Sequence, residues 1–235
     1  MSRPVLTVIT VVLNNARPLR ETIESVKRLR QIRCVHLIID GGSRDSTIEV
    51  IRDHAVRDPR IRWISEPDRG IYDAMNKGWL MADPESRILF LGAGDRLLSL
   101  PDQESLAGDG VIFGDVLIGR RLFKGGAGWA LRISNTLHHQ ALLVPRAIHP
   151  EPPFDLRFRL YADFDFNQRL LKRGVRFRYD PALRAAALPG GVSSRKDRRE
   201  MLAVVGKNFG PLWSLVALLC LPFRMLGRIA DGVGG

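Results

Sequence analysis

The chain has 235 residues, of which 45% are hydrophobic and 26% are charged, so it can bury a sizeable core as one domain, with or without an appendage. Its net charge of +11 predicts an anionic partner, such as a phosphorylated ligand, a nucleic acid or a membrane surface, unless the charge serves only solubility. The two cysteines, Cys34 and Cys220, lack the spacing of a metal site or a disulfide framework, which favours a reducing compartment. The first residues lack the pattern of a signal peptide.

Strands and helices are expected to alternate along residues 5 to 95. Apolar and β-branched runs predict strands at 5–13, 34–39, 61–65 and 88–91. Between them, apolar residues recur at helical spacing and predict helices around 18–29, 45–55 and 72–81. Strands that alternate with helices in this way predict a mainly parallel sheet with right-handed crossovers. No G-x-G-x-x-G follows the first strand, which argues against a dinucleotide-binding dehydrogenase.

Polar side chains follow each of these four strands. They are Asn14 and Asn15, Asp40, Glu66 and Asp68, and Asp95. The carboxyl ends of parallel strands share one edge of the sheet, where open α/β sheets bind their ligands. A single aspartate at such a place can serve only to shape a turn. Polar residues at four strand ends in succession instead predict a binding site along this edge.

The second half of the chain is less regular. The sequence predicts a strand or hairpin over 111–122, a buried strand over 141–144, a helix from about 163 to 174, a strand over 175–179 and a flexible loop over 190–194. Asp163 and Asp165 fall in the first turn of that helix, where a carboxylate can cap the helix or act as a general base. Phe164 and Phe166 beside them could raise the pKa of Asp163 toward the working pH.

The C-terminal tail contains no charged residue from Asn208 to Phe223. This run is shorter than the roughly 20 residues that a membrane-spanning helix needs, and Pro211 and Pro222 bracket it. Lysine and arginine residues flank it on both sides, which is typical of a helix that lies in a membrane interface. A core helix, or a patch that faces a protein partner, is the alternative.

These motifs give the chain a family likeness. It resembles the family-2 inverting glycosyltransferases, which use nucleotide-sugar donors, and in particular the bacterial polysaccharide or colanic-acid type. The motifs that carry the resemblance are 8–15, 39–47, 66–78 and 90–95, with His138-His139-Gln140 and 162–165 as less specific additions. The likeness is weak beyond about residue 184.

The resemblance implies an α/β fold of GT-A type, which is a Rossmann-like, mainly parallel sheet flanked by helices. It implies a glycosyltransferase domain over 1–190, with a nucleotide-sugar-binding half over 1–98 and an acceptor and catalytic half over 99–190. A basic and apolar tail over 191–235, helical and membrane-associating, completes the expected organisation.

The resemblance also implies roles for individual residues. Asp40 matches the residue that recognises the nucleotide base, Asp95 matches a ligand of a divalent metal (Mn²⁺ or Mg²⁺) on the donor diphosphate, and Asp163 matches the catalytic base. Asp165 is the rival for the base. It is placed with His139 and Gln140 on the acceptor and donor side. Further nucleotide-sugar-binding residues are expected at Thr10, Val12, Asn14, Asp68, Arg69, Asp73, Asn76, Lys77 and Gly94.

One departure from the family pattern concerns the metal. Gly92 and Gly94 stand where acidic or amide residues are common, which leaves Asp95 alone and predicts a weaker metal site. This departure is also the main support for an alternative function, a catalytically impaired nucleotide-sugar-binding or scaffold protein.

The expected function is transfer of a sugar, with inversion, to a saccharide or polyprenyl-phosphate-linked acceptor in cell-surface polysaccharide biosynthesis. Such transfer needs charge neutralisation at the leaving diphosphate and a base for the acceptor hydroxyl. Trp129, beside a glycine-rich stretch, could border the acceptor site. The protein is expected to be cytoplasmic and peripheral on the inner face of the cell membrane. A nucleic-acid partner is not expected, since the chain lacks the motifs of nucleic-acid-binding proteins despite its charge.

Overall fold

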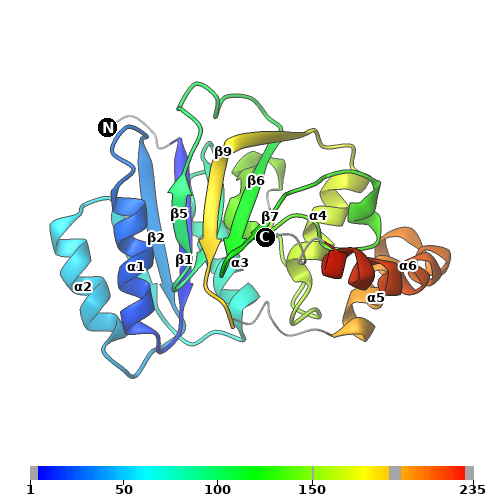
Figure 1. Ribbon diagram of the computed structural model, residues 1–235. Coiled ribbons are helices and arrows are strands. Elements are labelled where there is room, and N and C mark those ends of the chain that lie inside the picture. The colour runs from blue at the N-terminus through cyan, green and yellow to red at the C-terminus, as the bar shows by residue number, and fades with distance from the viewer. Residues whose placement is uncertain (1–4, 150, 191–196, 231–235) are drawn as a thin grey trace.

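The computed structural model of the protein describes residues 5–149, 151–190 and 197–230, and within 221–230 it describes the backbone alone (Figure 1). In this part of the chain, nine strands form one curled sheet in the order β3-β2-β1-β4-β8-β6-β9-β5, with β7 paired to β6. The fold is a mixed α/β fold, with helices on both sides of the sheet.

The N-terminal half is the predicted alternation. Its elements are β1 (Leu6–Val12), α1 (Ala16–Lys27), β2 (Cys34–Asp40), α2 (Thr47–Arg57), β3 (Ile61–Ser65), α3 (Ile71–Met81) and β4 (Arg87–Gly92). The pairs β1–β2, β1–β4 and β2–β3 are all parallel, which confirms the expected parallel sheet. Helices α1 and α2 share one apolar cluster, α3 packs in a second, and Val26 of α1 also enters a third.

Close packing of α3 on the sheet depends on Gly78. A side chain at this position would overlap Ile9 of β1, so only glycine lets the helix approach so near. Trp79, which is fully buried, then stacks on Phe90 of β4 with ring centroids 6.1 Å apart. This contact fixes the C-terminal end of α3 relative to the strand that leads to Asp95.

The C-terminal half is mostly antiparallel. Its elements are β5 (Arg96–Ser99), β6 (Val111–Ile118), β7 (Arg121–Phe123), the 3₁₀ turns η1 (Trp129–Arg132), η2 (His139–Ala141) and η3 (Arg146–Ile148), β8 (Leu142–Pro145), α4 (Ala162–Lys172), β9 (Phe177–Ala187), α5 (Arg198–Phe209) and α6 (Pro211–Ala230). Strand β8 pairs antiparallel with both β4 and β6, while β9 runs parallel to β6 and antiparallel to β5.

Two strand predictions need correction here. The strand expected over 175–179 is β9, which begins at Phe177 and continues to Ala187. It passes Pro181 because the register against β6 shifts between Phe113 and Asp115, and this irregularity accommodates a residue without an N–H group. Strand β5 was not expected, because its four residues, two of them exposed, carry little periodic signal. Most of the loop expected over 190–194 lies outside the described residues.

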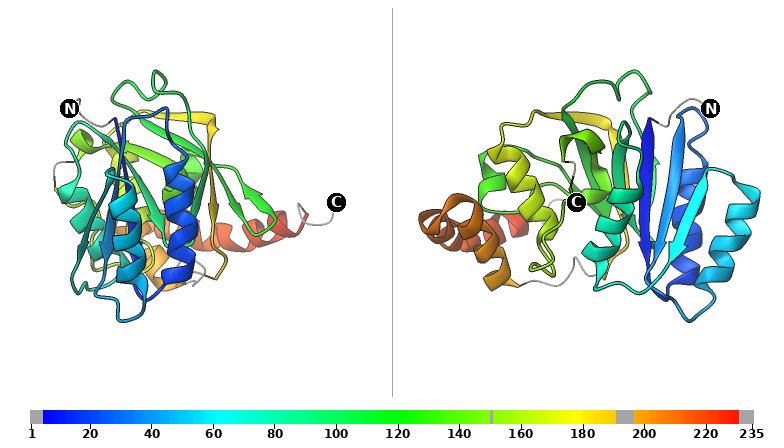
Figure 2. Two further views of the ribbon diagram at one scale, coloured as in Figure 1. Left: turned by 90° about the vertical axis from the view of Figure 1, so that its left-hand side faces the viewer. Right: turned by 180° about the vertical axis from the view of Figure 1, so that it is seen from behind.

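The tail packs on the domain along one face. Helix α5 buries Met201, Val204 and Val205 in the core that α4 also enters, and α6 follows it with Ala217 buried. Leucines on another face of α6 are exposed, among them Leu212 at 70%. Figure 2 shows this helix, in red, projecting from the body of the molecule. None of the helices in the described ranges is long and apolar enough to cross a membrane.

Candidate active site

The loop after β2 is shaped around Asp40, which is fully buried. Its Oδ2 accepts hydrogen bonds from the backbone N–H groups of Gly42 (3.1 Å) and Ser43 (2.9 Å) and from the Ser65 hydroxyl (2.6 Å). The Ser43 hydroxyl donates to Oδ1. With these donors around its carboxylate, Asp40 shapes the turn. Recognition of a nucleotide base by Asp40 stays a prediction.

Asn14 connects the loops after β1 and β2. Its backbone N–H donates to Ser43 Oγ at 2.7 Å, and its Oδ1 accepts from the Arg44 N–H at 2.8 Å. The next residue, Asn15, donates from Nδ2 to the Ala93 carbonyl at 3.3 Å. The loops after β1, β2 and β4 are therefore held together at one edge of the sheet.

Three side chains expected to bind the donor lie in the interior instead. Thr10 and Val12 share one face of β1 because side chains two residues apart point the same way, and the Thr10 hydroxyl lies 2.8 Å from His36 Nε2. Asn76 is buried and bonds both backbone polar groups of Phe154, at 2.8 and 2.9 Å. In this structure these side chains hold the sheet and the Phe154 segment in place rather than face the sheet edge.

Exposed charges gather between β3 and the first turns of α3. Asp73 accepts hydrogen bonds from the backbone N–H of Arg69 (2.9 Å) and from its guanidinium (3.3 Å). Burial raises the pKa of Asp73, but the hydrogen bonds and charge of Arg69 outweigh it, so the pKa lies below its ordinary value. Lys77 pairs with Glu66 at 2.9 Å, and Asp68 accepts from the backbone two residues on. The Arg69 side chain is 79% exposed, so its end of this ion pair is open to solvent.

Asp95 follows β4 and is 6% exposed. Its Oδ2 accepts from the Gly92 N–H (2.8 Å) and from Gln140 Nε2 (3.2 Å), and its Oδ1 accepts from the Leu188 N–H (3.0 Å). Gly94 has φ of 105°, and a Cβ at this position would lie 2.6 Å from Leu188 Cδ2. Backbone conformation and Leu188 together therefore require glycine at position 94, where the family pattern expects an acid or amide.

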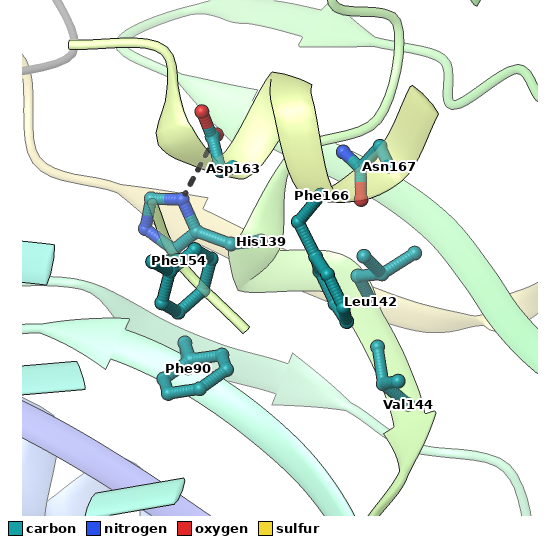
Figure 3. Close-up of a pocket in the computed structure, with 8 residues that line it drawn as sticks. All are labelled: Phe90, His139, Leu142, Val144, Phe154, Asp163, Phe166 and Asn167. Atoms are coloured by element: carbon teal, nitrogen blue, oxygen red, sulfur yellow. Dashed lines mark ion pairs between the residues drawn. The ribbon is translucent and has the colours of Figure 1, made fainter. Parts of the chain in front are cut away.

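Asp163 lies in the first turn of α4, at the wall of a small pocket (Figure 3). Oδ1 accepts from the Tyr72 hydroxyl at 3.1 Å and Oδ2 accepts from Asn135 Nδ2 at 3.1 Å. Nδ1 of His139 lies 3.6 Å from Oδ2, and Figure 3 shows the two side chains facing each other. The remaining lining residues are Phe90, Leu142, Val144, Phe154, Phe166 and Asn167.

The surroundings of Asp163 keep it ionised. Burial raises its pKa, but the hydrogen bond and charge of His139 outweigh burial and hold the pKa below the ordinary value of 3.8. The rise in pKa expected from the apolar neighbours Phe164 and Phe166 is wrong in net direction, because His139 opposes burial more strongly, and the Phe164 backbone N–H, which donates to Oδ1 at 2.8 Å, lowers the pKa further. Burial, followed by the charge of Asp163, raises the pKa of Tyr72, so its hydroxyl stays protonated and donates.

Asp165 faces another part of the molecule. It is completely buried, its Oδ2 accepts from Arg169 Nε at 2.9 Å, and its Oδ1 accepts from Lys207 Nζ at 2.8 Å and Asn208 Nδ2 at 3.0 Å. Residues two apart on a helix point about 200° apart, so the two acids of α4 cannot share one pocket. The structure places Asp165 in the contact between α4 and α5, not on the acceptor side as expected.

His139 and Gln140 connect the carboxylates of Asp163 and Asp95. These consecutive residues begin the turn before β8, and His139 contacts Asp163 while Gln140 contacts Asp95. Strand β8 pairs with β4, the strand that leads to Asp95. Asp95 and Asp163 therefore belong to one site, at the junction of the two halves of the sheet.

Comparisons with known proteins identify the family of the chain. Residues 7–96 match the model of the family described as Glycosyl transferase family 2. A PGL/p-HBAD biosynthesis glycosyltransferase from Mycobacterium bovis is 30% identical over 181 residues, which cover 72% of this chain and 70% of that protein. The chain belongs to glycosyl transferase family 2. A second glycosyltransferase, from Mycobacterium tuberculosis, is 33% identical over 182 residues, covering 70% of this chain and 68% of its own. These relatives support a transferase enzyme over a scaffold protein.

Solved structures similar to this glycosyltransferase confirm its GT-A fold. The mannosyltransferase PcManGT from Pyrobaculum calidifontis, in complex with GDP-Man and Mn²⁺, has a TM-score of 0.65 and 17% identity, covering 100% of this chain and 77% of its own. S. aureus TarS 1–349, in complex with UDP-GlcNAc, has a TM-score of 0.62 and 15% identity, covering 85% of this chain and 64% of its own. At this identity, the likeness shows the fold alone.

The oxygen atoms around Asp95 suit a divalent metal, although few of the metal's ligands would come from the protein. In the described ranges, no group of three or more His, Cys, Asp or Glu side chains could hold a metal. Asp95 offers a carboxylate, and beside it the buried Oε1 of Gln140 has no hydrogen-bond partner. Such a set suits Mg²⁺ or Mn²⁺, which commonly take one or two protein oxygens and complete their shell with water and phosphate oxygens.

Several residues of the site were not foreseen. Tyr72 lies within one of the family motifs, and Thr22, like Ser25, is a buried polar residue on the apolar face of α1, so both carried a usable signal. The Thr22 hydroxyl donates to the Asp95 carbonyl at 2.7 Å and supports its turn. Asn135 and Leu188 stand in irregular segments, and only the folded chain brings them to Asp163 and Asp95.

Proposed function

We propose that this glycosyltransferase moves a sugar from a nucleotide-sugar donor to a saccharide or polyprenyl-phosphate-linked acceptor, with inversion, in cell-surface polysaccharide biosynthesis of the bacterial, colanic-acid-like type. One observation carries the proposal. The adjacent residues His139 and Gln140 contact Asp163 and Asp95 respectively, so a base and a diphosphate-binding acid flank one place for the transferred sugar.

The donor diphosphate binds along the edge formed by the loops after β1 to β4. Asp95 would hold Mn²⁺ or Mg²⁺ there, and the bound cation would neutralise charge that develops on the leaving diphosphate. Arg69 and Lys77 supply further positive charge from the start of α3, and Asp68 and Asp73 fix their surroundings. Asn14, Asp40 and Gly94 shape the loops against which the nucleotide rests.

Asp163 accepts the proton of the acceptor hydroxyl. Its lowered pKa keeps it ionised at neutral pH, and Tyr72 and Asn135 hold its orientation. Asp165 is the weaker candidate because Arg169, Lys207 and Asn208 surround its carboxylate. A single displacement with one base and no covalent intermediate inverts the anomeric centre. Trp129, 63% exposed, is the proposed border of the acceptor site.

Three segments of the chain have separate roles in this proposal. Residues 1–98 bind the donor, 99–190 supply the base and the acceptor site, and 191–235 attach the protein to the inner face of the cell membrane. Support for the last part comes from α6, which exposes Leu212, Leu215 and Leu219 at spacings of three and four residues. The cations at Arg195 and Lys196 lie outside the described residues.

The test uses the full chain with a panel of UDP-, GDP-, dTDP- and CMP-sugars, Mn²⁺, and oligosaccharide or polyprenyl-phosphate-linked acceptors. We expect release of the nucleotide with one donor class, and NMR of the product should show the anomeric configuration opposite to that of the donor. A product that retains the configuration would contradict the single-displacement mechanism. A chain that neither binds nor turns over any donor would contradict the function as a whole.

A further inference from the structure

The side-chain oxygen of Gln140 is the feature that the proposed roles leave unexplained. Gln140 is 4% exposed, and among the described residues its Oε1 is the buried side-chain polar atom that has no hydrogen-bond partner. Buried polar atoms are nearly always satisfied, so an orphaned acceptor indicates a missing donor, water or cation. Its position beside a carboxylate decides which of these fits.

The amide end of Gln140 contacts the carboxylate of Asp95. The Asp95 carboxylate receives two backbone N–H groups, from Gly92 on Oδ2 and from Leu188 on Oδ1. Its third contact is Gln140 Nε2, 3.2 Å from Oδ2. A carboxylate has about four acceptor positions, two on each oxygen, so Oδ2 would regain one if the Gln140 amide turned its nitrogen away.

A half-turn of the amide would bring a second oxygen to this place. The nitrogen and oxygen of a glutamine amide occupy nearly equivalent positions, and rotation about the last bond exchanges them. Gln140 Oε1 would then lie where Nε2 lies now, 3.2 Å from Asp95 Oδ2. Neighbouring ligands of an octahedral Mg²⁺ or Mn²⁺ are about 3.0 Å apart, given bonds of about 2.1 Å. Two oxygens at this separation suit a shared cation.

The turn that carries Asp95 offers no second ligand of its own. Positions 92 and 94 are glycines, and a side chain at 94 would collide with Leu188. We propose that Gln140 is the second protein ligand of the divalent cation at Asp95, and that it replaces the side chain absent from this turn. This inference rests on the proposed function, because phosphate oxygens of the donor complete the shell. Cation binding is therefore coupled to nucleotide binding.

The experiment measures Mn²⁺ binding to the full chain by the loss of the EPR signal of free Mn²⁺, with UDP and, separately, GDP. Gln140→Leu removes the oxygen, and Gln140→Glu keeps it, replaces the amide nitrogen with a second oxygen and adds negative charge. The matched control is Gln168→Leu. Gln168 is equally buried, but it bonds the carbonyls of Leu131 and Arg132 and the amide of Asn208.

Gln140→Leu should weaken Mn²⁺ binding about 10-fold or more. Gln140→Glu should bind Mn²⁺ at least as tightly as wild type, and Gln168→Leu should match wild type while melting at a lower temperature. Equal Mn²⁺ affinity in wild type and Gln140→Leu would overturn the inference, as would loss of Mn²⁺ binding in Gln140→Glu. Calorimetry with each nucleotide in the absence of metal separates the two proposals, since a wild type that binds nucleotide but no Mn²⁺ overturns this inference alone.

Discussion

Asp163 and Asp165 stand two residues apart in the first turn of α4, yet they face two different regions of the molecule. Asp163 lies at the wall of the pocket, where its neighbours are Tyr72, Asn135 and His139. Asp165 lies in the contact between α4 and α5, where Arg169 and Lys207 neutralise it. The first region can exchange a proton with a ligand, while the second is closed by ion pairs.

The comparison teaches that the partners of a carboxylate, rather than its sequence context, assign its role. Both acids satisfy the same helix-start pattern, and either could serve as the base on that pattern alone. What separates them is that the donors to Asp163 hold it ionised and oriented beside a pocket, whereas those of Asp165 connect two helices. Asp163→Asn and His139→Leu test the pocket side of this contrast, and Asp165→Asn tests the contact between α4 and α5.

The largest effect, a loss of turnover, is expected from Asp163→Asn. Loss of a general base typically costs 10²- to 10⁴-fold in turnover, so we expect kcat to fall by about that factor. Nucleotide binding, measured by thermal shift, should persist, and Asp58→Asn at the opposite edge of the sheet is the control. If Asp163→Asn retains full activity, the assignment of the base is wrong.

Asp165→Asn should act on stability instead. It leaves Arg169 and Lys207 without their buried partner, but both cations are partly exposed, so the free energy of unfolding should fall by about 2–3 kcal/mol, somewhat below the usual cost for a buried pair. Urea denaturation measures this change. Asp155→Asn, which removes the more exposed partner of Lys207, should cost less, and an equal cost would contradict the special place of Asp165.

A weaker effect is expected at the α5–α6 region. Replacing both Leu215 and Leu219, which are 52% and 62% exposed, with Glu should lower binding to anionic vesicles about 10-fold or more. Val56→Glu, at an exposed apolar position on α2, should leave vesicle binding unchanged. Unaltered co-sedimentation of the double variant would argue that α6 does not attach the protein to membranes.

The smallest effect at neutral pH is expected from His139→Leu. Because His139 lowers the pKa of Asp163, its removal should raise that pKa and move the acid limb of the kcat/KM profile to higher pH. A carboxyl group whose pKa is lower in the folded state than in the unfolded state stabilises the protein at any pH above its unfolded pKa. This contribution is lost as the pH falls through the folded pKa. Acid stability should therefore also decrease in the variant. An unchanged acid limb would contradict the claim that His139 lowers the pKa of Asp163.

The sequence predicted the alternation of elements up to β4, the parallel pairing of these strands and the common edge at their ends. It could do so because backbone periodicity and strand polarity are local properties, visible in runs such as 34–39 and 88–91. The family motifs added Asp95 and Asp163 as candidates. Strand β5 and the length of β9 were missed, and the bounds of α5 within the helical tail were not predicted, since they depend on pairing or packing with distant segments.

Only the tertiary structure decided which polar side chains share the site. Thr10, Val12 and Asn76 belong to predicted motifs, but packing places their side chains in the interior, and Asp165 meets Lys207 only because α5 docks on α4. The contact of Gln140 with Asp95 likewise requires β8 to pair with β4. A sequence pattern shows which functional groups a chain contains. Which of these groups lie next to one another depends on contacts between residues far apart in the chain.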